Sequence, residues 1–216
     1  MDKIILAAVI LSVVLSCNDR SAKNQSSGNE IRKIELVAGQ HQAIAAFAEG
    51  CFWCSEHIFE SVAGVDSAIS GYAGGTVPFP TYELVNTETT GHAETVLVYY
   101  DSTKIDYSEL IRVFFASHDP TTPDQQGPDV GSSYRSILFY LTPHEKEIAE
   151  SMLKEFQSSG TFKDPIVTEI KQLTEFYRAE EYHQEYIEHN PGNAYVRNVS
   201  IPRFELFKKT YNGTLK

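Results

Sequence analysis

The fold predicted for this chain is organised around one short stretch, Gly50-Cys51-Phe52-Trp53-Cys54-Ser55-Glu56. Two cysteines stand three positions apart there, and the single tryptophan of the chain lies between them. The apolar run over residues 44–48 predicts a strand before the stretch, and the apolar spacing within residues 52–62 predicts a helix after it. Cys51 is therefore expected at the point where a strand turns into a helix.

That position favours a reactive thiol at Cys51. Backbone N–H groups at a helix start are unpaired, and the helix dipole adds partial positive charge there. Both effects stabilise a thiolate, so we expect the helix start to lower the pKa of Cys51. Most cysteines are small buried hydrophobic residues without chemistry, but the strand-to-helix position and the second cysteine favour a functional role here.

Composition and charge limit the class of protein. The chain has 216 residues, of which 42% are hydrophobic and 22% charged, as in ordinary globular proteins that bury a core. Its net charge is −11 and it contains no basic cluster, so nucleic-acid binding has no electrostatic basis. No repeat or second linker occurs after residue 30, which predicts one domain over residues 41–216.

The N-terminus has the pattern of an export signal over residues 1–17. Lys3 precedes an apolar run over residues 4–15, which is too short to cross a bilayer core of about 30 Å. Val14-Leu15-Ser16-Cys17 resembles the bacterial lipobox, in which the cysteine becomes lipidated after cleavage. We therefore expect an exported lipoprotein anchored at Cys17 and a flexible tether over residues 18–40. An ordinary signal peptide or a cytosolic protein with an unusual leader are the alternatives.

The remaining pattern alternates strands and helices. Strands are expected at 44–48, 65–72, 93–100, 136–141 and 167–173; helices are expected at 52–62, from 106 through 114, at 143–157, 180–189 and 203–211. Asp106 is a helix cap with Glu109 at the capping-box position, and residues 119–133 are expected to form a functional or disordered loop. The order predicts an α/β (α+β) roll whose core is a split βαβ, ferredoxin-like plait.

Motifs distributed along the whole domain carry a family resemblance. They are Gly50-Cys51-Phe52-Trp53-Cys54-Ser55-Glu56, Gly71-Tyr72-Ala73-Gly74-Gly75, Pro80-Thr81-Tyr82, Thr90-Gly91-His92-Ala93-Glu94, His118-Asp119-Pro120-Thr121-Thr122, Gln126-Gly127-Pro128-Asp129-Val130-Gly131, Tyr134-Arg135-Ser136 and Ala179-Glu180-Glu181-Tyr182-His183-Gln184. From about residue 44 to residue 207 the chain resembles the A-type peptide methionine sulfoxide reductases. The resemblance implies reduction of the S-epimer of methionine sulfoxide, free or in proteins, without a cofactor.

The resemblance also implies catalytic roles. Cys51 is the implied nucleophile toward sulfur, and Glu94 is the implied acid for the departing oxygen. Glu94 stands in an otherwise apolar predicted strand, and burial would raise its pKa and keep it protonated; the alternative is an outward-facing strand residue. Tyr82 and Tyr134 match the family's hydroxyl donors to the sulfoxide oxygen, and Asp129 matches the carboxylate of the pocket network.

The resemblance implies that the same stretch shapes the substrate site and returns the oxidised enzyme to its reduced form. Phe52 and Trp53 would wall the methyl group of the substrate, because ring faces accept sulfur and methyl contacts; they could also be core residues. The family commonly has glycine at Cys54 and recycling cysteines near the C-terminus, whereas residues 208–216 contain none. Cys54 is then the resolving thiol for a Cys51 sulfenic acid, and a thioredoxin-like protein would reduce the disulfide.

Three other functions are compatible with parts of the sequence. A zinc site could use Cys51, Cys54 and His57, with His92 as a further ligand. A thioredoxin-type disulfide exchanger would explain the two cysteines alone, and a non-enzymatic lipoprotein that binds oxidised peptides would not need Cys51. Each explains fewer motifs than the reductase, for which we expect a monomer without metal whose only membrane contact is its lipid.

Overall fold

The computed structural model describes residues 31–216, so the predicted signal peptide and lipobox lie outside the described residues. In chain order the elements are β1 Arg32–Lys33, β2 Gln42–Glu49, α1 Phe52–Glu60, β3 Val65–Ala73, α2 Tyr82–Val85, β4 Ala93–Asp101, α3 Tyr107–Ser117, β5 Gln125–Gln126, β6 Asp129–Val130, a 3-10 turn Ser132–Tyr134, β7 Ser136–Tyr140, α4 Pro143–Ser159, β8 Glu169–Gln172, β9 Phe176–Arg178, a 3-10 turn Glu181–His183, α5 Tyr186–His189, a π-helical turn Val196–Ser200 and α6 Ile201–Thr210. No helix within residues 31–216 is long and apolar enough to cross a membrane.

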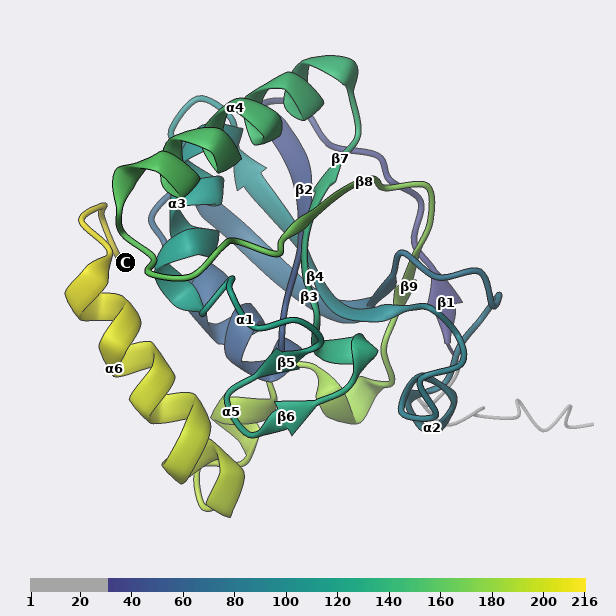
Figure 1. Cartoon of the computed structure of the whole chain (residues 1–216). Helices are drawn as coiled ribbons and strands as arrows, with labels where there is room; N and C mark the ends of the chain where they lie inside the picture. The colour runs from purple at the N-terminus through teal and green to yellow at the C-terminus, as the bar shows by residue number, and fades with distance from the viewer. Residues whose placement is uncertain (1–30) are drawn as a thin grey trace, which may run out of the picture.

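A mixed sheet of seven strands forms the centre, in the order β1-β9-β3-β4-β2-β7-β8 (Figure 1). Every neighbouring pair is antiparallel except β7 and β8. The four inner strands follow the order β3-β4-β2-β7, with α1 connecting β2 to β3 and α3 lying between β4 and β7. The predicted mixed α/β class is confirmed, and the first and third strands of this unit lie side by side at its centre.

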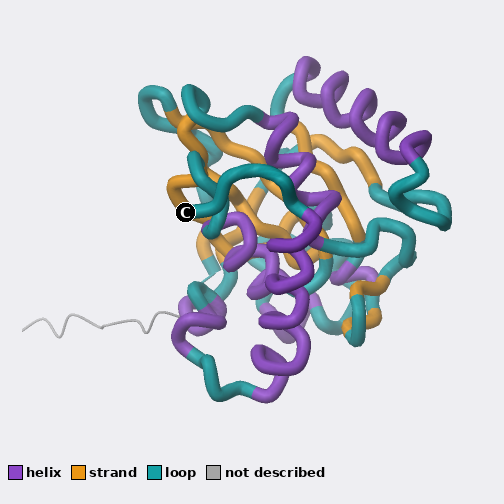
Figure 2. The backbone as a smooth tube through the Cα atoms, turned by 90° about the vertical axis from the view of Figure 1, so that its left-hand side faces the viewer, coloured by secondary structure: helices purple, strands orange, loops and turns teal. Residues whose placement is uncertain are grey.

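The two faces of the sheet are separated by the alternation of side chains along β2. Ala45 and Phe47 belong to the main core, which the helices close, whereas Ile44, Ala46 and Ala48 point into a second cluster on the opposite face. Successive side chains of a strand point to opposite faces, so this strand is apolar on both. Figure 2 views the side on which α6 lies in front of the strands. The strand predicted at 44–48 is therefore confirmed as a central one.

Helix ends follow the predicted signals in part. Asp106 caps α3 and accepts a hydrogen bond from the Glu109 N–H at 2.8 Å. Glu109 does not complete a capping box, because its carboxylate accepts a hydrogen bond from the Tyr211 hydroxyl at 2.8 Å. A complete capping box instead begins α4, where Thr142 and Glu145 exchange hydrogen bonds.

Three predictions of local structure are wrong. The disordered alternative for residues 119–133 is wrong, since they contain the β5–β6 hairpin and part of a 3-10 turn. The helix predicted at 180–189 is interrupted by Glu185, whose φ of 48° is left-handed, so only Tyr186–His189 is helical after it. The tether predicted at 18–40 includes β1, which pairs with β9 and is therefore part of the sheet.

Candidate functional site

A cavity of about 270 Å³ opens where β2 meets α1. Its lining residues are Cys51, Phe52, Trp53, Tyr82, Glu94, Asp129, Tyr134, Asn193 and Tyr195. Seven of these nine were predicted from the sequence as catalytic or substrate-binding residues. The cavity does not include Cys54, which is buried behind it. The structure thus brings residues from five separate parts of the chain to one small space.

Backbone geometry fixes the two central groups. Cys51 is the N-cap residue of α1, directly after β2 and Gly50. Glu94 comes from the neighbouring strand β4, and its Oε2 accepts a hydrogen bond from the Phe52 N–H at 3.0 Å. This N–H is one of the unpaired donors at the helix start, so Glu94 is tied to the residue next to Cys51.

Glu94 is buried, with 2% of its surface exposed, and the alternative of an outward-facing residue is wrong. Burial raises the pKa of Glu94 to about 8, against the lowering effect of its hydrogen bond from Phe52. A carboxyl group is harder to ionise when its charge is removed from water. Glu94 is therefore largely protonated at neutral pH and can donate a proton into the cavity.

The expected lowering of the Cys51 pKa at the helix start is wrong. Burial raises the pKa of Cys51, and the neighbouring Cys54 and Glu94 raise it further. The pKa of Cys54 is instead lowered to about 6, first by a hydrogen bond from the Cys51 thiol and then by Arg203 and Ser200, against burial. The two sulfurs act as a pair that holds one negative charge, with Cys54 as its preferred position.

Aromatic rings form one wall of the cavity and are also core residues. The ring of Trp53 stacks on Tyr186 with centroids 3.7 Å apart, and its Nε1 donates a hydrogen bond to His183 Nδ1 at 3.0 Å. Phe52 is buried against Tyr72, with ring centroids 5.8 Å apart. Each ring is therefore packed in the core and also lines the cavity, so a core position does not exclude the predicted methyl-binding role, which stays a prediction.

Hydroxyl groups and a carboxylate line the opposite side. Burial raises the pKa of Tyr82 and of Tyr134, so both phenols remain hydrogen-bond donors at neutral pH. Tyr195 donates a hydrogen bond to Asp129 Oδ2. Burial raises the pKa of Asp129 as well. Tyr195 and Asn193 were not predicted, because they lie outside the quoted motifs and Tyr195 is one of 12 tyrosines.

The motif over residues 179–184 supports the site from behind. Glu180 accepts hydrogen bonds from the Tyr82 N–H at 3.0 Å and from the Tyr72 hydroxyl at 2.9 Å. Gln184 binds both the N–H and the C=O of Ser70 in β3, at 3.1 and 3.0 Å. These contacts hold α2, and with it Tyr82, against the sheet.

The residues proposed for a zinc site do not converge. His57 Nδ1 lies 2.6 Å from Glu188 Oε1, and His92 donates from Nε2 to the Val77 carbonyl at 2.8 Å. Within the part of the chain that the structure describes, no group of three or more His, Cys, Asp and Glu side chains is placed to hold a metal ion.

Comparison with known proteins matches the chain to one family. The model of the family "Peptide methionine sulfoxide reductase" matches residues 43–215. The peptide methionine sulfoxide reductase MsrA of Natronomonas pharaonis is 48% identical over 169 residues, covering 78% of this chain and 95% of that protein. Solved structures include methionine sulfoxide reductase A of Corynebacterium diphtheriae, which is 34% identical with a TM-score of 0.64 over 72% of this chain and 78% of that one.

The fold is also similar to that of Mxr1 from Saccharomyces cerevisiae in its reduced form. That structure is 32% identical, has a TM-score of 0.69 and is covered over 94% of its length by 74% of this chain. Mxr1 has also been solved in complex with Trx2.

Burial of Glu94 predicts a pH-dependent stability. Its folded-state pKa of about 8 lies above an unfolded value of about 4.3, so the folded state holds an extra proton between these values. Stability therefore falls as pH rises through that window. Between pH 5.5 and 8.5, we expect the free energy of unfolding of the wild type to fall relative to Glu94→Gln by on the order of 3 kcal/mol in urea titrations.

The control for this comparison is Glu147→Gln, because the Glu147 side chain is 79% exposed. It should follow the wild type at both pH values. Equal pH dependence in the wild type and Glu94→Gln would show that Glu94 is ionised in the folded protein.

Proposed function

The chain belongs to the peptide methionine sulfoxide reductase family, and we propose that it reduces the S-epimer of methionine sulfoxide, free or in proteins, through the thiol of Cys51. One observation supports this most directly: Cys51 and the protonated Glu94 share a small cavity walled by aromatic rings. A soft nucleophile, an acid and a methyl-binding wall are what sulfoxide reduction requires.

The first step reduces the substrate and oxidises the enzyme. The sulfur of Cys51 attacks the sulfoxide sulfur while Glu94 gives its proton to the sulfoxide oxygen. An S–S bond forms between Cys51 and the substrate, and the S–O bond breaks as the oxygen leaves as water with the protons of Glu94 and of the thiol. Water then attacks the Cys51 sulfur, the S–S bond breaks to release methionine, and the proton lost by the attacking water returns to the carboxylate of Glu94. The products are methionine, reduced by two electrons, and a Cys51 sulfenic acid, oxidised by two.

The cavity lining orients the substrate for this step. Tyr82 and Tyr134 donate hydrogen bonds to the sulfoxide oxygen as negative charge develops on it. Phe52 and Trp53 hold the S-methyl group against their ring faces. Asp129 orients Tyr195 by accepting a hydrogen bond from its hydroxyl.

Recycling uses Cys54 and an external dithiol. The Cys54 sulfur attacks the sulfenic acid, an S–S bond forms and water leaves. A thioredoxin-type protein then reduces the disulfide by thiol–disulfide exchange. The complex of the yeast relative with Trx2 supports this choice of reductant. A simple disulfide exchanger would also use both cysteines, but it would give no role to Glu94, Tyr82 or Tyr134.

Replacing each cysteine is expected to block a different step of the reaction. Cys51→Ser should abolish reduction, because the attacking sulfur is lost. Cys54→Ser should release about one methionine per enzyme and then stop with thioredoxin as reductant, since its sulfenic acid has no partner thiol. Methionine is measured by chromatography after reaction with each separated epimer, with dithiothreitol and thioredoxin compared. Turnover by Cys51→Ser would contradict the mechanism, and full thioredoxin-driven turnover by Cys54→Ser would remove the resolving role.

Glu94→Gln tests the acid separately from the thiols. The amide keeps an acceptor for the Phe52 N–H but cannot supply a proton, so methionine release in a single turnover should slow on the order of 100-fold. The wild-type rate should fall as pH rises through about 8, where Glu94 ionises, and the variant should lack this decline. Unchanged release by Glu94→Gln would assign the acid role to another group.

We also propose that the domain acts as a monomer outside the cytoplasm. It is held by a lipid on Cys17 after cleavage of the signal sequence that precedes Cys17. The pattern Val14-Leu15-Ser16-Cys17 supports this location, and residues 18–30 would serve as the tether. Labelled palmitate should be incorporated into the wild type in a bacterial host and not into Cys17→Ser. Equal labelling of the two, or none in the wild type, would exclude the anchor.

A further inference from the structure

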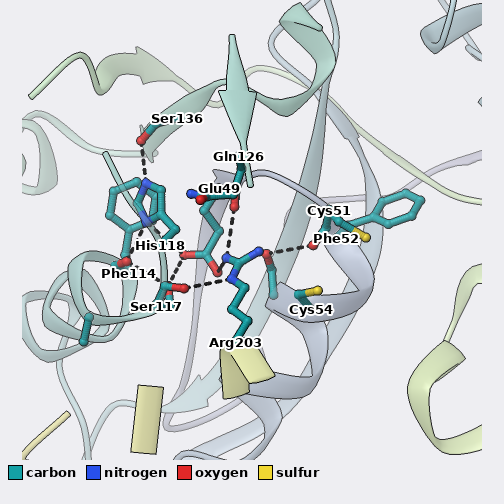
Figure 3. Close-up of polar contacts among 12 residues, drawn as sticks. Glu49, Cys51, Phe52, Cys54, Phe114, Ser117, His118, Gln126, Ser136 and Arg203 are labelled. Carbon is teal, nitrogen blue, oxygen red and sulfur yellow. Dashed lines mark hydrogen bonds and ion pairs between the residues drawn. The ribbon is translucent and has the colours of Figure 1, made fainter. Parts of the chain in front are cut away.

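Arg203 of α6 points toward Glu49 and Ser117, with the two cysteines beside it (Figure 3). Its Nη2 donates to the backbone oxygen of Glu49 at 3.0 Å and to Glu49 Oε1 at 2.9 Å. Its Nε donates to the backbone oxygen of Ser117 at 2.8 Å. Glu49 is the last residue of β2, so the guanidinium is fixed to the chain just before Gly50 and Cys51. Its side chain is only 12% exposed.

The same end of α6 contacts Cys54. Ser200, one turn before Arg203, has its hydroxyl oxygen 3.2 Å from Cys54 Sγ. The Nη1 atom of Arg203 lies 3.7 Å from the position that a Cβ on Gly50 would occupy, beside the backbone that leads into Cys51. One turn of helix from near the C-terminus therefore supplies a hydroxyl and a cation to the C-x-x-C pair.

We propose that Arg203 is a positioning residue for recycling: its guanidinium, held in place by Glu49, stabilises the Cys54 thiolate. This inference rests on the proposed function and concerns a step after methionine release. The cavity that receives the substrate does not include Arg203, so the first step does not require it.

In the step that Arg203 supports, electrons pass only between the sulfurs of Cys51 and Cys54. The Cys54 thiolate attacks the sulfur of the Cys51 sulfenic acid, the new S–S bond forms, and the S–O bond breaks. The leaving hydroxide takes a proton from Glu94 or solvent and departs as water. The Cys51 sulfur is reduced by the electron pair that oxidises the Cys54 sulfur, so no other reactant is needed.

The charges around Cys54 explain why a cation is required there. Glu49, Glu94, Asp129 and the partner sulfur of Cys51 all face it, and each would oppose a thiolate when ionised. Among the groups facing Cys54, Arg203 is the cation, and its attraction lowers the pKa of Cys54 together with Ser200 and the Cys51 thiol. A buried positive charge next to a thiol favours its ionised form.

Glu49 allows the charge of Arg203 to be removed without leaving a buried ion unpaired. Removing one partner of a buried ion pair is strongly destabilising, whereas removing both is often tolerated. The double variant Glu49→Gln/Arg203→Met therefore tests the cation, Arg203→Lys restores it, and Arg197→Met is the matched control at an exposed arginine on the preceding turn. Each is made in the full chain carrying Cys17→Ser, so that only Cys51 and Cys54 titrate.

The first measurement is thiolate absorbance near 240 nm against pH. We expect the lower apparent pKa of the cysteine pair to rise by about one unit or more in the double variant. Arg203→Lys and Arg197→Met should stay close to the parent. An unchanged lower pKa in a folded double variant would overturn the role of Arg203.

The second measurement is a single turnover with one equivalent of methionine sulfoxide and no reductant. Methionine release should be preserved in the double variant, while disulfide formation, followed by loss of dimedone-reactive sulfenic acid, should slow about tenfold near pH 7. Because a thiolate of higher pKa is the stronger nucleophile, the variant should equal or exceed the parent above its raised pKa. These crossing pH profiles distinguish loss of charge from general damage.

The outcomes separate the two proposals. Slower disulfide formation at every pH, without crossing, would reduce Arg203 to a packing residue and overturn the inference. An absence of methionine release from the parent protein would instead overturn the proposed function, whatever Arg203 does.

Discussion

Removal of titratable groups from water at the junction of β2 and α1 is the constraint on which the site depends. The junction lies inside the core rather than at the surface, so Cys51, Cys54, Glu49 and Glu94 are all buried. Desolvation shifts pKa values by up to 3–5 units, whereas the dipole at a helix end is worth about 0.3–1 kcal/mol, or less than one unit. Burial therefore decides the protonation of the acid and of the nucleophile, and the helix start makes a smaller contribution.

This balance gives the two cysteines different chemistry although they are neighbours in one helix. Cys51 opens into the cavity beside Glu94 and carries the proton of the pair. Cys54 faces α6, where a hydroxyl and a guanidinium favour negative charge. In the proposed cycle, the thiol that attacks the substrate is thus kept neutral next to a neutral acid, and the resolving thiol is held on the side of α6 as a thiolate.

Much of the site could be predicted because motifs at the ends of long elements carry it. The stretch at 50–56 adjoins a strand with a clear apolar pattern, and the family resemblance indicated Glu94; the structure places Cys51, Phe52, Trp53 and Glu94 in one cavity. Tyr195 and Arg203 could not be found in this way, because their roles come from contacts with Asp129 and Glu49, which are 66 and 154 positions away. Strands of two or three residues, such as β1 and β9, have too few positions for a period to be detected.

The C-terminal helix α6 connects the recycling chemistry of Cys54 with the buried charges of the site. The family resemblance implies recycling cysteines near the C-terminus in the commonest pattern, whereas residues 208–216 of this chain contain no cysteine. Its α6 still packs against α1 and α3, but it presents Ser200 and Arg203 to a thiol already inside α1. In the proposed recycling step, the resolving thiol lies in the first turn of a buried helix, where a fixed charge takes the place of solvation by water. The buried ion pair of Arg203 with Glu49, whose formation costs desolvation, is understandable as the source of that charge.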